Sequence, residues 1–227
     1  MTDTTRPGRR RLAEDPAFQD THFVVIDFEG TTPKGAAPEP IEVAALGLKH
    51  EPGCGPVRSG FSFQSLIRPP THAPVTPFGA KQNGITPEDV TDASPATTVL
   101  RTLDEELPPR PVLLVAHHAP VEGNFIYAYR EACPRLAYTR IVDTRLLAKH
   151  LAPDLPAYDL DALLARYGIP QPPHRHRAMD DVIVTASLFR TLLTEAARRH
   201  AITSLTSLIR VSSRRPRASA PTQLELP

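Results

Sequence analysis

The chain has 227 residues and a formal net charge of only +1, so no overall field marks a polyanion as its partner. No apolar run reaches the roughly 18 residues that a membrane span needs, and the N-terminus lacks the apolar core of a signal peptide. Two cysteines are too few for a disulfide framework or a zinc cage, so a reducing cytoplasm is the simplest location.

The first third of the chain predicts an antiparallel meander. Residues 1–20 are polar and aperiodic, which predicts a flexible leader. An apolar run over 23–29, closed by Gly30, predicts a buried strand. Two further strands are expected at 41–48 and 61–67, with no helix between the three.

Strands and helices alternate in the remainder, which is typical of a parallel α/β region. The wholly apolar run over 112–116 predicts a strand covered on both faces. The fold class is therefore α/β, with a mixed five-stranded sheet in one domain over 21–200 and a C-terminal helix and disordered tail over 201–227. The other expected elements are a strand at 141–142 and helices at about 95–107, 121–132, 144–150, 158–167, 178–199 and 201–211.

Two carboxylates stand at the end of the first strand. Side chains alternate across a strand, so Asp27 and Glu29 point to the same face. Charges at the end of a core strand are costly to bury, and hard divalent cations such as Mg²⁺ offset that cost. A lone D-x-E is also typical of a strand end that meets water, so the metal interpretation depends on partners elsewhere.

His176 and Asp181 are the expected distant partners. On one ideal helix their spacing would turn the side chains about 140° apart, so His176 must lie in the loop and Asp181 in the first helical turn. On the helical wheel Asp181 lies in the mainly apolar stripe whereas Asp180 does not, which makes Asp181 the inward acid. The alternative is that both aspartates only favour the helix dipole.

Three motifs in order resemble those of the DEDDh, DnaQ-like 3′–5′ exonucleases, which include the epsilon proofreading subunit of bacterial replicative polymerase. They are D-x-E at 27–29, an H-N-A-x-x-D-like segment at 117–122 and H-x-A-x-x-D at 176–181. The segment 83–86, Asn-Gly-Ile-Thr, resembles the family's H-G-I-T loop. The resemblance covers about residues 22–195 and implies an RNase H-like fold.

The resemblance also implies two divalent cations, Mg²⁺ or Mn²⁺, and hydrolysis of phosphodiester bonds from 3′ ends to release 5′ mononucleotides, in DNA proofreading or repair. The nucleic acid would be single-stranded or frayed, and His176 would take the proton of the attacking water. The implied metal residues are Asp27, Glu29 and Asp181 for one ion and Asp27 with Glu122 for the other, and the implied substrate contacts are Gly30, Thr31, Ile85 and His118.

The second motif departs from the family. His118 stands where the family has Asn, and Glu122 stands where it has Asp. Glutamate moves the oxygen donors out by one methylene, which predicts reduced activity or a preference for Mn²⁺. Two alternatives stay open: a nuclease-like binding module with lost or weak turnover, and an oligoribonucleotidase-type RNA exonuclease.

The C-terminus resembles a pentapeptide that docks on the bacterial sliding clamp. Gln223, Leu224 and Leu226 match the pattern, although Pro227 replaces the usual aromatic residue. The arginines at positions 210, 214, 215 and 217 fit either a nonspecific phosphate-contacting arm or a solvated tail.

Overall fold

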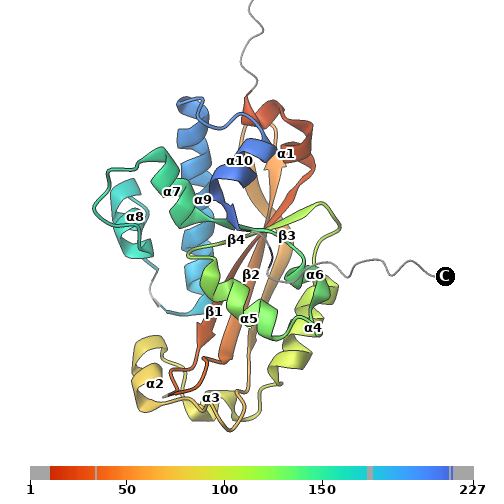
Figure 1. The fold of residues 1–227 in the computed structure, drawn as a ribbon, viewed down its shortest axis with the longest axis vertical. Coiled ribbons are helices and arrows are strands. Elements are labelled where there is room, and N and C mark those ends of the chain that lie inside the picture. Colours follow the sequence, from red (N-terminus) through yellow and green to blue (C-terminus); the bar gives the residue numbers. More distant parts are fainter. Residues whose placement is uncertain (1–10, 34, 173–175, 215, 217–227) are drawn as a thin grey trace, which may run out of the picture.

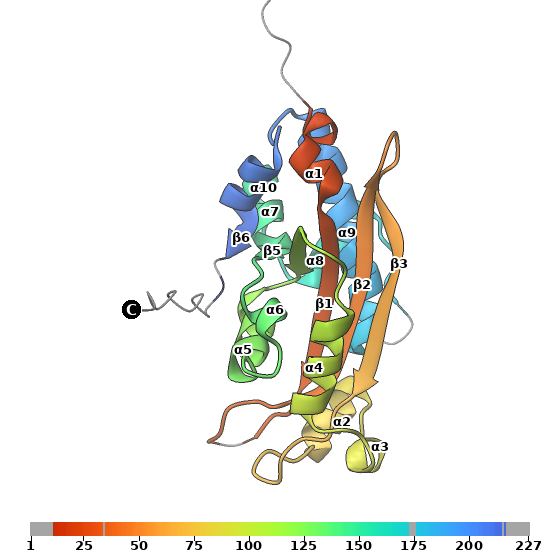
Figure 2. The same cartoon turned by 90° about the vertical axis from the view of Figure 1, so that its right-hand side faces the viewer.

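The computed structural model describes residues 11–33, 35–172, 176–214 and 216. They form a six-stranded mixed sheet in the order β3-β2-β1-β4-β5-β6, with helices packed against it (Figures 1 and 2). This confirms the expected α/β class and mixed sheet. Among these described residues, no helix combines the length and apolar character that crossing a membrane requires.

β1 (His22–Gly30) lies in the middle of the sheet. It pairs antiparallel with β2 (Pro40–Glu51), which pairs antiparallel with β3 (Gly55–Leu66), so the predicted meander is confirmed. On its other side β1 pairs parallel with β4 (Val112–Ala116), and β4 pairs parallel with β5 (Ile141–Asp143). The carboxyl ends of β1, β4 and β5 therefore meet at one edge of the sheet.

The sheet has six strands instead of the five expected. Helix α10 (Leu205–Ser212) leads into β6 (Ser213–Arg214), which pairs antiparallel with β5. A two-residue strand has no periodicity of its own and is defined by the edge that it joins, so no sequence pattern indicated it. The predicted clamp segment over 223–227 lies outside the described residues.

The expected leader over 1–20 is wrong for its second half. Residues Leu12–Glu14 form a 3₁₀ helix and α1 (Pro16–Asp20) follows it. The side chains of Leu12 and Phe18 are buried, 3% and 2% exposed, in the main hydrophobic core. Two isolated buried side chains do not produce a periodic apolar pattern in the sequence. The segment therefore resembles a polar leader.

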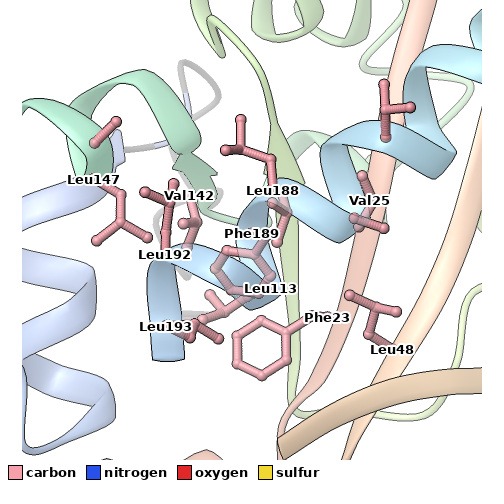
Figure 3. Packing of buried hydrophobic residues seen from close by; sticks show 14 of the residues in the cluster. Phe23, Val25, Leu48, Leu113, Val142, Leu147, Leu188, Phe189, Leu192 and Leu193 are labelled. Atoms are coloured by element: carbon pink, nitrogen blue, oxygen red, sulfur yellow. The ribbon is translucent and has the colours of Figure 1, made fainter. Parts of the chain in front are cut away.

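Helices cover both faces of the sheet because side chains of β1 alternate between two cores. Phe23 and Val25 pack with α9 (Ala178–Arg198), and Figure 3 shows Phe189 of that helix beside Phe23, with ring centroids 5.3 Å apart. Val24 and Ile26 belong to the opposite core. The face of the sheet with Phe23 and Val25 is covered by α7 (Thr144–Leu151), α8 (Leu160–Tyr167) and α9. The opposite face is covered by α4 (Ala96–Glu106), α5 (Pro120–Ala128) and α6 (Pro134–Ala137). Two short helices, α2 (Pro77–Asn83) and α3 (Pro87–Thr91), lie beyond the end of β1 (Figure 1).

Candidate active site

Three of the predicted residues converge where β1 ends beside the start of α9 (Figures 1 and 2). One ligand atom each of Glu29, His176 and Asp181 lie within 4.8 Å of one another. Asp181 is 5% exposed, while Asp180 is only half-buried, so the choice of Asp181 as the inward acid is confirmed. Two carboxylates and one imidazole at this separation can share a cation or a polarised water.

The backbone places His176 and Asp181 as the spacing predicted. Arg177 is the N-cap of α9 and Ala178 is its first residue, so His176 precedes the helix and Asp181 lies in its first turn. His176 has a φ of 62°, in the left-handed region where residues other than glycine are uncommon. This backbone conformation places the imidazole outside the helix and close to the carboxylates of Glu29 and Asp181.

An ion pair between the buried carboxylate of Glu42 and the partly exposed guanidinium of Arg177 fixes this turn to the sheet. Glu42 of β2 is 0% exposed, and its carboxylate accepts hydrogen bonds from Arg177 Nε at 3.0 Å and Nη2 at 2.8 Å. It also accepts from the backbone N–H of Ala178 at 3.0 Å and from Gln64 Nε2 at 3.0 Å. Arg177 and Ala178 lie between His176 and Asp181, so Glu42 positions both.

The electrostatics of Glu42 agree with this geometry. Burial on its own raises the pKa of the Glu42 carboxyl, but the hydrogen bonds from Arg177, Ala178 and Gln64, together with the charge of Arg177, lower it below its usual value. Glu42 therefore carries its charge in the folded protein. The sequence did not indicate it, because the residue lies within an apolar strand and its partner is 135 residues away.

The loop that resembles H-G-I-T reaches the site through Asn83. Its Nδ2 lies 3.5 Å from Glu29 Oε2, a long hydrogen bond, and its Oδ1 accepts from the N–H of Ile85 at 3.1 Å. The substrate contact expected of Ile85 stays a prediction, and in this structure the residue has a structural role. Its side chain is 1% exposed and packs in a small core with Ile41 and Val90, where it anchors the loop instead.

Asp27 and Glu122 lie outside the three-residue cluster found among the described residues. Asp27 is half-buried on β1. Glu122 of α5 is 3% exposed, and its Oε2 has no hydrogen-bond partner among the described residues. Burial, and then the neighbouring carboxylate of Asp143, raise the pKa of Glu122 well above its usual range. A buried acid with an unsatisfied oxygen beside a second acid is a donor set that a divalent cation would suit.

Asp143 was not among the predicted site residues. It ends β5, is 1% exposed, and its Oδ1 accepts from the N–H groups of Arg145 at 2.9 Å and Leu146 at 3.4 Å. Arg214 Nε of β6 lies 3.7 Å from the other carboxylate oxygen. Asp143 thus caps α7 and connects the C-terminal strand to the edge where Glu122 lies.

The predicted substrate contacts differ in accessibility. His118 is exposed just after β4, with a φ of 71°, in the left-handed region where both His and Asn are enriched. Thr31 is 3% exposed, and its Oγ1 accepts from the N–H of Glu39 at 2.9 Å. Thr31 therefore holds the loop that follows β1, and His118 is the more available of the two.

Gly30 is required by a close approach of the ring of Phe125. A Cβ at Gly30 would lie 2.7 Å from Phe125 Cζ, so Gly30→Ala is expected to lower the free energy of unfolding by about 1–3 kcal/mol, measured by urea unfolding. Gly60→Ala is the control, because its Cβ meets nothing within 4 Å. Equal effects of the two substitutions would contradict the steric explanation.

Comparisons with known proteins place this chain among exonucleases in sequence. The family model RNase_T, described as exonuclease, matches residues 24–189. Relatives include the PolC-type DNA polymerase III of Thermotoga maritima, 29% identical over 214 residues that make up 92% of this chain and 14% of the relative. The same enzyme of Streptococcus pneumoniae is 29% identical over 193 residues, 84% of this chain and 12% of the relative. The chain thus spans only a small part of the length of these relatives.

Solved structures show the same fold. The nuclease domain of 3′hExo, described as a DEDDh family member bound to rAMP, has a TM-score of 0.67 at 19% identity and covers 81% of this chain and 96% of that one. Exonuclease X in complex with 5′ overhanging duplex DNA has a TM-score of 0.55 at 23% identity, over 76% and 91% of the two chains. These likenesses confirm the expected RNase H-like fold. The family model matches residues 24–189, well over half of this chain, and the chain therefore belongs to the RNase_T exonuclease family.

Proposed function

We propose that the protein is a metal-dependent 3′–5′ exonuclease that hydrolyses phosphodiester bonds at nucleic-acid 3′ ends and releases 5′ mononucleotides. The convergence of Glu29, His176 and Asp181 from two distant parts of the chain carries the proposal. The PolC-type polymerase relatives favour DNA and a role in proofreading or repair. A cytoplasmic location is part of the same proposal.

The donor set suits two Mg²⁺ or Mn²⁺ ions. Glu29 and Asp181, with Asp27 on the same strand face as Glu29, would hold one ion. Asp27 with Glu122, whose buried Oε2 has no described hydrogen-bond partner, would hold the other. Such ions, when bound, activate a water nucleophile and neutralise charge on the scissile phosphate.

The chain itself supplies proton transfer and positioning. His176 is suited to take the proton of the attacking water, because its ring lies beside both carboxylates and outside the helix. Glu42 holds Arg177 and Ala178 in place, and this fixes the position of the His176 imidazole relative to the Asp181 carboxylate. Exposed His118 would contact the substrate strand beyond the cleaved phosphate, and Thr31 would shape the loop beside it.

Incubation of 5′-labelled DNA and RNA oligonucleotides with Mg²⁺ or Mn²⁺ tests the proposal. A ladder of products shortened from the 3′ end is expected, and Asp27→Ala should remove it. A ladder that persists in Asp27→Ala would show a contaminating nuclease. Faster cleavage of RNA than of DNA would favour the oligoribonucleotidase-type alternative, and no ladder with either metal would reject exonuclease activity.

Glu122 supports a second candidate, a nuclease-like module that binds 3′ ends with weak turnover. The observation behind it is that Glu122 lies near Asp143 and outside the cluster of Glu29, His176 and Asp181. If this acid limits turnover, Glu122→Asp is expected to raise kcat with Mg²⁺ by about tenfold, since the shorter side chain restores the usual donor length. A kcat unchanged or lowered by Glu122→Asp, measured in single-turnover cleavage, rejects the second candidate.

Binding to a sliding clamp remains a prediction from the C-terminal pattern alone. Deletion of residues 223–227 is expected to abolish retention of the clamp in a pull-down while leaving cleavage of a free oligonucleotide unchanged. Retention that survives the deletion would reject the role of Gln223, Leu224 and Leu226.

A further inference from the structure

A basic cleft adjoins the candidate active site at the carboxyl ends of β4 and β5. Its volume is about 210 Å³, and it is lined by His118, Asp143, Arg145, Lys149 and Arg214, among others. These residues come from four places in the fold: the loop just after β4, the end of β5, helix α7 and the C-terminal β6. The cationic side chains of the cleft are those of Arg145, Lys149 and Arg214, and none of them is a residue to which catalysis has been assigned.

The charge of this basic cleft is positive. Arg145 and Lys149 lie four residues apart and so project from one face of α7, and the side chain of Arg214 is 51% exposed. The only acid that lines the cleft within the described residues is Asp143, whose carboxylate is 2% exposed and already accepts from backbone N–H groups. Three accessible cations therefore face one buried acid.

The location relates the cleft to the reaction. β4 is the direct neighbour of β1 in the sheet, and β5 follows β4. With strands about 4.8 Å apart, the end of β5 lies about 10 Å across the sheet from β1, at the level of Ile26, three residues before Glu29. Ligands of α/β sheets occupy this carboxyl edge, so one extended ligand can reach both places. An exonuclease that holds a 3′ end at Glu29 must place the rest of the strand somewhere beyond it.

We propose that the basic cleft is a phosphate-binding subsite for the strand upstream of the scissile bond. This inference rests on the proposed function and adds where the remaining strand binds. Arg145, Lys149 and Arg214 contact successive phosphates and contribute affinity, while hydrolysis takes place at Glu29 and Asp181. The contact is independent of base sequence, because cations read the phosphate backbone and not base edges.

The lining favours phosphate over base stacking. The large apolar side chains that are exposed in the described part of the chain are Phe78, Val121, Tyr127 and Tyr138, and none of them lines this cleft. Tyr158 does line it, but its hydroxyl donates to the carbonyl of Ala152 at 2.7 Å and its ring packs against the main core. Binding here is therefore electrostatic and should weaken steeply with salt.

The double variant Arg145→Gln/Lys149→Gln tests the subsite, because glutamine keeps an unbranched polar side chain and the helix propensity while it removes charge. Binding of a fluorescein-labelled single strand of about twelve nucleotides is measured by anisotropy without divalent ions. We expect Kd to rise about tenfold in low salt, and the slope of log K against log salt to fall by about 1.4, or 0.7 for each lost phosphate contact. The matched control is Arg101→Gln/Arg190→Gln, which removes two exposed cations from α4 and α9.

Several results would overturn the subsite. An unchanged Kd and salt slope would do so, as would an equal loss in the control, which would indicate only general attraction. Cleavage of a dinucleotide, too short to reach the cleft, should keep its kcat/KM in the double variant, and an equal loss there would assign these residues to the catalytic centre. If the wild-type protein cleaves nothing with Mg²⁺ or Mn²⁺ yet the binding loss appears, the exonuclease proposal fails and the subsite stands.

Discussion

Asp181→Asn is expected to lower kcat by about a thousandfold, because it removes one of the two negative charges in the cluster with Glu29 and His176. Asp181 is 5% exposed, and the amide has nearly the same shape as the carboxyl, so the fold is expected to persist. The loss should appear in single-turnover cleavage with either Mg²⁺ or Mn²⁺. Thermal unfolding of the variant should remain cooperative.

Asp180→Asn is the matched control for this experiment. It makes the same chemical change in the same turn of α9, on a half-buried side chain that lies off the inward stripe. We expect its kcat to stay within about threefold of the wild-type value. Similar losses in both variants would show that the charge of the helix terminus matters and that Asp181 has no special place in the chemistry. Full activity of Asp181→Asn would remove the central acid from the proposed site.

The strand and helix that carry the candidate site were predictable because local patterns specify them. The apolar run of β1 and the stripe of α9, which includes Val184 and Leu188, encode burial directly at periods of two and 3.6 residues. The same helical wheel distinguishes Asp181 from Asp180. The position of a polar residue relative to a strong apolar pattern is thus readable from sequence.

Features that depend on pairing between distant segments were not predictable in this way. Glu42 appears in the sequence as one acid within an apolar strand, and only contact with Arg177 explains its burial. β6 exists because β5 offers an open edge. Glu122 follows its motif in sequence, but its environment depends on Asp143, which a different strand delivers. The chemistry of single residues could be inferred, whereas their mutual positions required the fold.

Arg177→Gln is expected to lower the free energy of unfolding by about 3 kcal/mol, because it leaves the carboxylate of Glu42 buried without its counter-charge. For a chain of this size the corresponding drop in Tm is about 6–12 °C. Glu42→Gln removes the buried charge itself and should cost less, about 1–2 kcal/mol. Both variants should also lower kcat, since Arg177 lies between His176 and Asp181, and urea unfolding with single-turnover cleavage measures the two effects.

The pH dependence distinguishes this ion pair from a packing effect. The pKa of Glu42 is lowered from 4.5 in the folded chain, mainly by hydrogen bonds that outweigh its burial, so the unfolded state binds the proton more tightly. The stabilisation is therefore present above pH 4.5 and is lost as the pH falls through the lower folded pKa. The free energies of unfolding of wild type and Glu42→Gln should converge between about pH 5 and 3. The control Arg130→Gln, in an exposed pair with Glu131, should change the free energy of unfolding by less than about 0.5 kcal/mol. A difference in free energy of unfolding between wild type and Glu42→Gln that stays constant across this pH range would contradict the ion-pair explanation.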